Sequence, residues 1–137
     1  MDKIDTLIAY LFAIQAFAKD IHYSASGEAF YSKHLLADEI YKGIDEQIDA
    51  LIETCILHQR KPFSIFHYRN NAQELATAVI EYPSAKDFGY LSRIIDLTIQ
   101  HIESIDTENY LRGEMALIDS IAQDLQRKLG LITRQVG

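Results

Sequence analysis

Apolar residues recur at every third or fourth position along most of the chain, which is the pattern of helices with one buried face. In one such segment Ile40, Ile44 and Ile48 fall on the same side. The pattern predicts helices over residues 5–23, 27–58 and 72–82, a further long helix opened by Ser84 or Asp87, and a last one that follows Asp106 and Thr107 and is capped by Gly130. Residues 59–71 are predicted to form a connection. We therefore expect an all-α four-helix bundle, with the short helix in the long connection between its second and third long helices.

Metal-capable side chains share one face of the second predicted helix. The four, which fall within roughly 100° of one another at about 3.6 residues per turn, are His34, Asp38, Asp49 and Glu53. The first two lie about 22 Å along the axis from the last two, at a rise of about 1.5 Å per residue. They cannot share one ion within a single chain. One helix therefore carries two half-sites.

Two copies of this helix, packed antiparallel across a two-fold axis, would bring the half-sites together, with His34 of one chain facing Glu53 of the other. C2 dimers produce such self-complementary contacts. The midpoint of the face falls between Gly43 and Ile44, and we expect the missing side chain of Gly43 to let the helices approach there, which offsets glycine's helix penalty of about 1 kcal/mol. His22, near the end of the first helix, joins the site if the first two helices form a hairpin.

The donor set of two imidazoles and three carboxylates suits iron, manganese or zinc rather than copper(I). Ferrous iron fits best, because carboxylates stabilise the more highly charged ferric product and so assist oxidation. Two alternatives remain. A histidine and an aspartate four residues apart also occur as solvated pairs on helix surfaces, and the group could be a buried polar network without metal. Unpaired charges beside an apolar stripe are costly, which favours a metal.

A longer set of residues resembles the Dps-type mini-ferritins. The matching positions are His22 followed by an aromatic residue, a turn glycine at Gly27, Phe30, and then His34, Asp38, Asp49 and Glu53. The resemblance is strong over about residues 5–58 and rests elsewhere on helix order and length. It implies a ferritin-like four-helix subunit that assembles through two-fold dimers into a hollow dodecameric shell. The ferroxidase site would combine His22, His34 and Asp38 of one chain with Asp49 and Glu53 of its mate.

The same resemblance implies a function in iron detoxification and storage. Members oxidise ferrous iron, preferentially with hydrogen peroxide and otherwise with dioxygen, and deposit ferric mineral inside the shell. Zinc or manganese could occupy such sites as surrogates. Two features depart from the family pattern: Tyr23 stands where many members have tryptophan, and we expect no lysine-rich N-terminal extension of the kind that DNA-binding members carry.

Charge argues against DNA as a partner. The formal net charge is −7, and an acidic surface repels a polyanion whose phosphates dominate binding. Residues 60–69 are basic and aromatic, but we expect Phe63, Phe66 and Tyr68 to pack at the dimer interface instead. Acidic residues of the later helices, including Glu114 and Asp124, are expected mostly on solvated faces. Some could attract ferrous ions to a pore.

The chain of 137 residues, 48% of them hydrophobic, is long enough for one domain, residues 1–137, with a sufficient core. Gln15, Lys19 and Asp20 interrupt the first apolar stretch, so we expect no membrane span. The first residues lack the features of a signal peptide. Cys55, the only cysteine, can form no intrachain disulfide, which suits a reducing cytoplasm.

Two rival functions belong to other classes. A non-enzymatic ferritin-like shell or DNA-protection protein would keep the fold and let the metal site lapse, and the presence of all five ligands argues against it. A di-iron oxygenase within a single bundle needs repeated Glu-x-x-His motifs. No glutamate of this chain is followed three positions later by histidine.

Overall fold

The computed structural model describes residues 1–27, 29–80 and 88–136, and all regular elements within them are helical. The long helices are α1 (Lys3–Ser24), α2 (Phe30–Leu57), α4 (Phe88–Glu103) and α5 (Arg112–Val136). A shorter helix, α3 (Ile65–Ile80), follows α2, and a 3-10 turn, η1 (Thr107–Asn109), precedes α5. No helix of the described residues is long and apolar enough to cross a membrane. The all-α prediction is confirmed.

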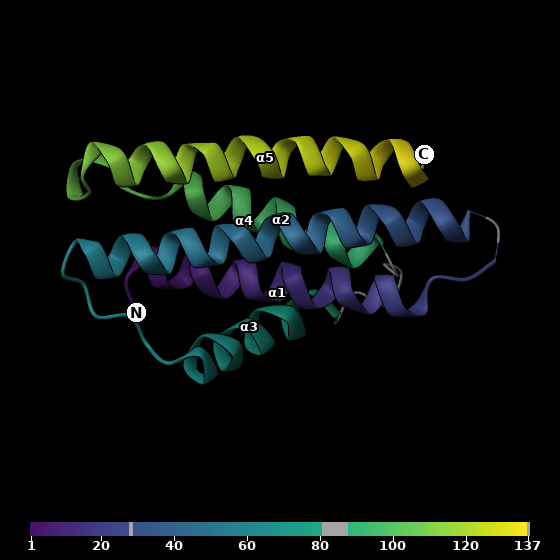
Figure 1. The fold of residues 1–137 in the computed structure, drawn as a ribbon, viewed down its shortest axis with the longest axis horizontal. Coiled ribbons are helices and arrows are strands. Elements are labelled where there is room, and N and C mark those ends of the chain that lie inside the picture. Colours follow the sequence, from purple (N-terminus) through teal and green to yellow (C-terminus); the bar gives the residue numbers. More distant parts are fainter. Residues whose placement is uncertain (28, 81–87, 137) are drawn as a thin grey trace.

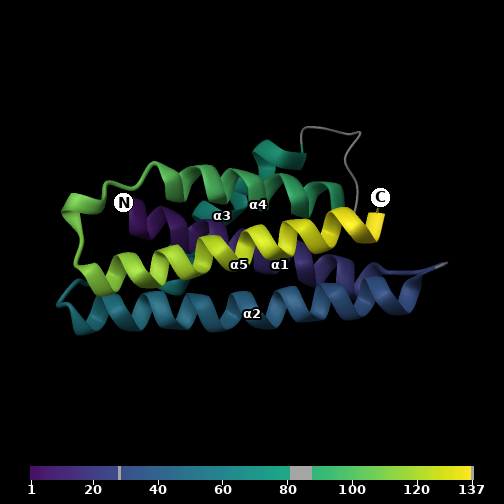
Figure 2. The same ribbon diagram turned by 90° about the horizontal axis from the view of Figure 1, so that it is seen from above.

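The four long helices lie side by side, and α3 flanks α1 (Figures 1 and 2). The helices α1 and α2 form an antiparallel hairpin, whereas α2 and α4 run in the same direction and α5 returns beside α4 (Figure 1). α1 packs against α2, α3 and α4, and α5 packs on α4 and α2. This confirms the predicted bundle with an extra helix in its long connection.

Helix α1 is buried on several sides because three other helices pack on it. The successive residues Leu7, Ile8 and Ala9 are fully buried although they point in directions about 100° apart around the helix. Its first turn is closed by a reciprocal cap, in which the Asp5 backbone N–H donates to the Asp2 carboxylate and the Asp2 N–H donates to the Asp5 carboxylate. The helix therefore begins at Lys3, two residues before the predicted start.

The predicted start of the short helix at residue 72 is wrong, because α3 already begins at Ile65. Ser64 caps it: its hydroxyl and its carbonyl oxygen both accept hydrogen bonds from the His67 N–H, at 3.3 and 3.0 Å. The polar and aromatic residues that follow Ser64 resemble a loop in composition, yet they form two helical turns. The predicted end at residue 82 and the predicted openings at Ser84 and Asp87 lie outside the described residues.

Two predicted helix boundaries near the C-terminus are also wrong. Gly130 does not cap the last helix, which continues to Val136. A glycine inside a helix costs about 1 kcal/mol, and the full burial of Ile132 one half-turn later helps to offset it. Asp106 caps the turn η1 instead, since its Oδ1 accepts from the Glu108 N–H at 3.0 Å.

Candidate metal site

His22 and His34 face each other where α1 ends and α2 begins. Their ring centroids are 3.8 Å apart, with 23° between the ring planes. Nδ1 of His34 lies 2.9 Å from the His22 carbonyl oxygen, and Nδ1 of His22 lies 3.3 Å from the His34 carbonyl oxygen. A carbonyl oxygen can only accept, so each Nδ1 carries a proton and donates it. When the ring is neutral, its Nε2 then keeps a lone pair, which is the state in which a histidine binds a metal ion.

The turn between α1 and α2 produces this pairing. Gly27 has φ +76° and Ala29 has φ +61°, and both values lie in the left-handed region. Glycine adopts that region without steric cost, whereas alanine does so only under constraint. These residues reverse the chain direction, so the last turn of α1 lies beside the first turns of α2, as the hairpin prediction required.

Asp38 lies one turn beyond His34, but its carboxylate faces the next lysine. Nζ of Lys42 is 2.8 Å from Oδ2 of Asp38. The hydrogen bond from Lys42 lowers the pKa of Asp38, and the charge of Lys42 acts in the same direction. Among the described residues, no group of three or more His, Cys, Asp or Glu side chains is placed to hold a metal ion. One subunit thus presents two imidazoles and a nearby carboxylate, and not a complete site.

Asp49 and Glu53 lie farther along the same helix, about 22 Å from the histidine end at a rise of about 1.5 Å per residue. Both are exposed. The structure does not bring them to His22 or His34 within the chain. Their carboxylates face outward, where a second molecule can approach.

Gly43 does not serve the role predicted for it. A Cβ at this position would lie 2.7 Å from Nζ of Lys128 in α5, so the missing side chain makes room for a lysine of the same chain. The expectation that it admits a second copy is therefore wrong. The reason is geometric, because nine residues at about 100° each place Gly43 on the opposite side of α2 from His34.

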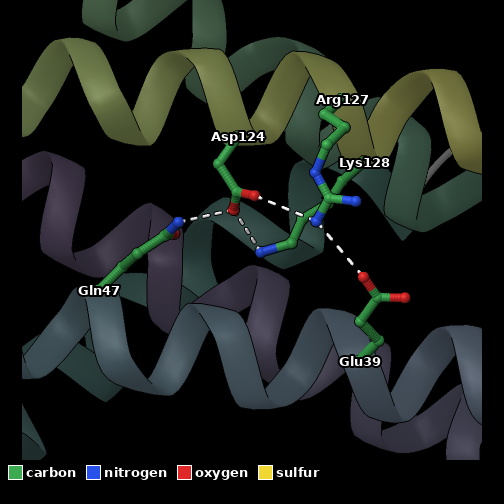
Figure 3. A network of polar contacts seen from close by, with 5 residues as sticks. All are labelled: Glu39, Gln47, Asp124, Arg127 and Lys128. Carbon is green, nitrogen blue, oxygen red and sulfur yellow. Dashed lines mark hydrogen bonds and ion pairs between the residues drawn. The ribbon is translucent and has the colours of Figure 1, made fainter.

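Lys128 belongs to a polar network centred on Asp124 that the sequence did not reveal (Figure 3). Its side chain is 2% exposed, and its Nζ lies 2.5 Å from Oδ2 of Asp124. Nε2 of Gln47 donates to the same oxygen at 2.6 Å. Arg127 bridges Asp124 and Glu39, at 3.3 Å each. The spacing of four between Asp124 and Lys128 is the one sequence signal, and it does not distinguish a buried pair from a surface pair.

Glu114 also departs from the expected solvated face. It is 2% exposed, and its Oε1 accepts hydrogen bonds from Nη2 of Arg60, at 3.3 Å, and from the Leu111 N–H, at 3.0 Å. His58 Nδ1 lies 3.6 Å from its other oxygen. The basic residue Arg60 therefore pairs with the first turn of α5, which is a structural role.

The aromatic residues of the same region divide into two groups. Tyr68 is fully buried and donates its hydroxyl to Oδ1 of Asp5 at 2.7 Å, so it belongs to the core of this chain. Its predicted place at a dimer interface is wrong. Phe63 and Phe66 are 42% and 79% exposed. Their place at an interface stays a prediction.

Comparison of the backbone with solved structures finds the crystal structure of a DPS protein from Vibrio cholerae O1, described as a member of a broad superfamily of ferritin-like diiron-carboxylate proteins. The TM-score is 0.63, and the match covers 98% of this chain and 87% of that chain. The chain has the ferritin-like fold. Because the identity is 16%, the likeness shows the ferritin-like fold alone and does not assign the site. No protein-family model and no curated protein matches the sequence.

Proposed function

We propose that two copies of this ferritin-like subunit bind ferrous iron between them and oxidise it, and that a hollow dodecameric shell stores the ferric product. The observation that carries the proposal is the reciprocal hydrogen bonding of His22 and His34, with Asp38 one turn beyond, which puts a proton on each Nδ1 and leaves Nε2 of the neutral ring as the metal-binding atom. In each site these three residues belong to one subunit. Asp49 and Glu53 of the second copy complete the donor set.

The order of the ligands along α2 supports a two-fold arrangement. His34 and Glu53 are equally far from the midpoint between Gly43 and Ile44, and so are Asp38 and Asp49. An antiparallel second copy centred on that midpoint brings His34 level with the mate's glutamate and Asp38 level with the mate's aspartate. Both sites form at once, as an isologous C2 contact requires.

Exposed apolar side chains of α2 follow the same symmetry. Tyr31 and Ile56, which are 70% and 56% exposed, are equally far from the midpoint of the ligand face. Leu35, which is 47% exposed, corresponds in the same way to Ile52, which is half-buried against the core of its own chain. The register that joins the metal ligands therefore also covers these apolar side chains, which removes apolar surface from water.

Iron is the substrate and cargo in this proposal. Each ferrous ion gives up one electron, and hydrogen peroxide accepts two as it is reduced to water, so oxidation of iron ions in pairs avoids hydroxyl radical. Dioxygen is the alternative oxidant. The carboxylates favour the ferric product through its higher charge. Zinc and manganese suit the same donor set and would bind there as surrogates.

The test is the double variant Asp49→Ala with Glu53→Ala. Ferrous oxidation, followed by the absorbance of the ferric product, should fall to the rate of free iron while the assembly persists in light scattering. The matched control is Glu74→Ala with Asp119→Ala, which also removes two exposed carboxylates and should oxidise at the wild-type rate. Unchanged oxidation in the first variant refutes the site. A wild-type shell that oxidises iron no faster than buffer would instead support the non-enzymatic shell.

A further inference from the structure

Lys42 forms an ion pair with Asp38, one of the proposed iron ligands. It lies one turn beyond that aspartate on the ligand face of α2, and its Nζ is 2.8 Å from Oδ2 of Asp38. Its side chain is 68% exposed and that of Asp38 is 29% exposed. A cation that binds Asp38 meets this ammonium group at close range and is repelled by it. The lysine must move before the carboxylate can serve as an unhindered ligand.

The two-fold register places a second acceptor in front of Lys42. The inference rests on the proposed function, in which α2 pairs with an antiparallel copy centred between Gly43 and Ile44. Lys42 and Asp45 are equally far from that midpoint, so Lys42 of each subunit comes level with Asp45 of the other. Both lie within about 30° of the centre of the ligand face, at about 100° per residue.

Asp45 is suited to accept a lysine from outside the chain. It is exposed, and its Oδ1 accepts a hydrogen bond from the neutral amide of Gln15 at 3.0 Å. Lys19 reaches Asp45 only at longer range, since its Nζ lies over the ring of Tyr41, 4.4 Å from the centroid. The two Lys42 side chains also approach each other near the axis, where a carboxylate between them relieves their repulsion.

We propose that Lys42 acts as a guard of the iron site, meaning that it blocks Asp38 until the dimer forms. In the separate subunit Lys42 pairs with Asp38, and in the dimer it pairs with Asp45 of the second copy. Exposed ion pairs on one helix are weakly held, so the competing carboxylate can take the ammonium group. Dimer formation then does two things at once. It supplies the mate's ligands and it frees Asp38.

The experiment measures Zn²⁺ binding to the assembled protein by titration calorimetry, without any oxidant. Asp45→Asn removes the acceptor but no metal ligand, so Lys42 stays on Asp38 and the affinity for Zn²⁺ should fall about fivefold, the upper end for an exposed ion pair. Adding Lys42→Gln to this variant removes the guard and should restore the affinity to within about twofold of wild type. Lys33→Gln, the same change on another face of α2, is the matched control and should leave binding unchanged.

Rescue distinguishes the guard from a merely structural role. If Asp45 only strengthens the dimer, Asp45→Asn shifts the sedimentation profile and Lys42→Gln does not restore Zn²⁺ binding, which overturns the proposal. An unchanged affinity in Asp45→Asn also overturns it. His34→Ala separates the two levels of inference. If His34→Ala binds Zn²⁺ like wild type, the proposed metal site itself is refuted. If His34→Ala loses Zn²⁺ binding but Asp45→Asn keeps the wild-type affinity, only the guard role of Lys42 is refuted.

Discussion

Replacing Gly43 by alanine should have opposite effects on stability depending on whether Lys128 is present. In the wild-type chain the new Cβ would lie 2.7 Å from Nζ and 3.5 Å from Cε of Lys128, so the ammonium group must shift, and because its side chain is buried we expect the shift to break its hydrogen bond to Asp124. A hydrogen bond to a charged group contributes about 1.5–3 kcal/mol, and alanine recovers about 1 kcal/mol of helix propensity. The free energy of unfolding should therefore fall by about 0.5–2 kcal/mol.

In a Lys128→Ala background the same substitution should stabilise the protein. Apart from the neighbouring residues and backbone of α2 itself, no other atom of the described residues lies within 4 Å of this Cβ, so only the propensity gain of about 1 kcal/mol remains. Urea unfolding followed by circular dichroism measures the effect of Gly43→Ala on the unfolding free energy in both backgrounds, which completes a double-mutant cycle. All variants are compared at the same subunit concentration, because assembly shifts apparent stability. Gly130→Ala, where a Cβ meets nothing within 4 Å, is the control and should stabilise both backgrounds alike. Effects of Gly43→Ala that agree between backgrounds within about 0.5 kcal/mol would refute the packing argument.

Three further predictions concern the reactivity of a buried thiol, the stability contribution of a buried hydroxyl and the pH dependence of a buried carboxylate. Cys55 is 4% exposed and burial raises its pKa, so it should react with a thiol reagent only in denaturant, and rapid reaction in the native protein would contradict this. Tyr68→Phe removes the hydroxyl that donates to Asp5 at 2.7 Å and should lower the unfolding free energy by about 1–2 kcal/mol, more than Tyr10→Phe does; equal losses would count against it. Burial alone would raise the pKa of Asp124, but its ammonium partner and other donors lower it overall. Its contribution is therefore present at neutral pH and lost as pH falls below about 4, so the stability gap between wild type and Asp124→Asn should narrow there, and a gap that does not depend on pH would refute it.

The helices and their order could be predicted because the signals are local. The period of apolar residues marks each buried face, and residues 24–27 mark the turn that pairs α1 with α2. The same turn allowed the meeting of His22 and His34 to be anticipated. Helix boundaries are harder to predict from local signals. The start of α3 depends on the capping hydroxyl of Ser64, whereas the aromatic and polar residues that follow it are typical of a loop.

The buried charges could not be predicted, because each depends on a partner far away in the chain. Gln47 and Asp124 meet across 77 positions, and Arg60 and Glu114 across 54. Nothing near Lys128 in the sequence shows that a glycine on another helix leaves space for it. Helix geometry alone, by contrast, places Gly43 on the side of α2 opposite the ligand face.

The most direct measurement of the central claim is a crystal structure after soaking with ferrous ions, with anomalous diffraction recorded at the iron absorption edge. The account predicts iron at a two-fold interface, bound by His22, His34 and Asp38 of one subunit and by Asp49 and Glu53 of the other. An antiparallel α2 dimer with no anomalous peak between these residues, or a peak bound entirely within one subunit, would contradict it.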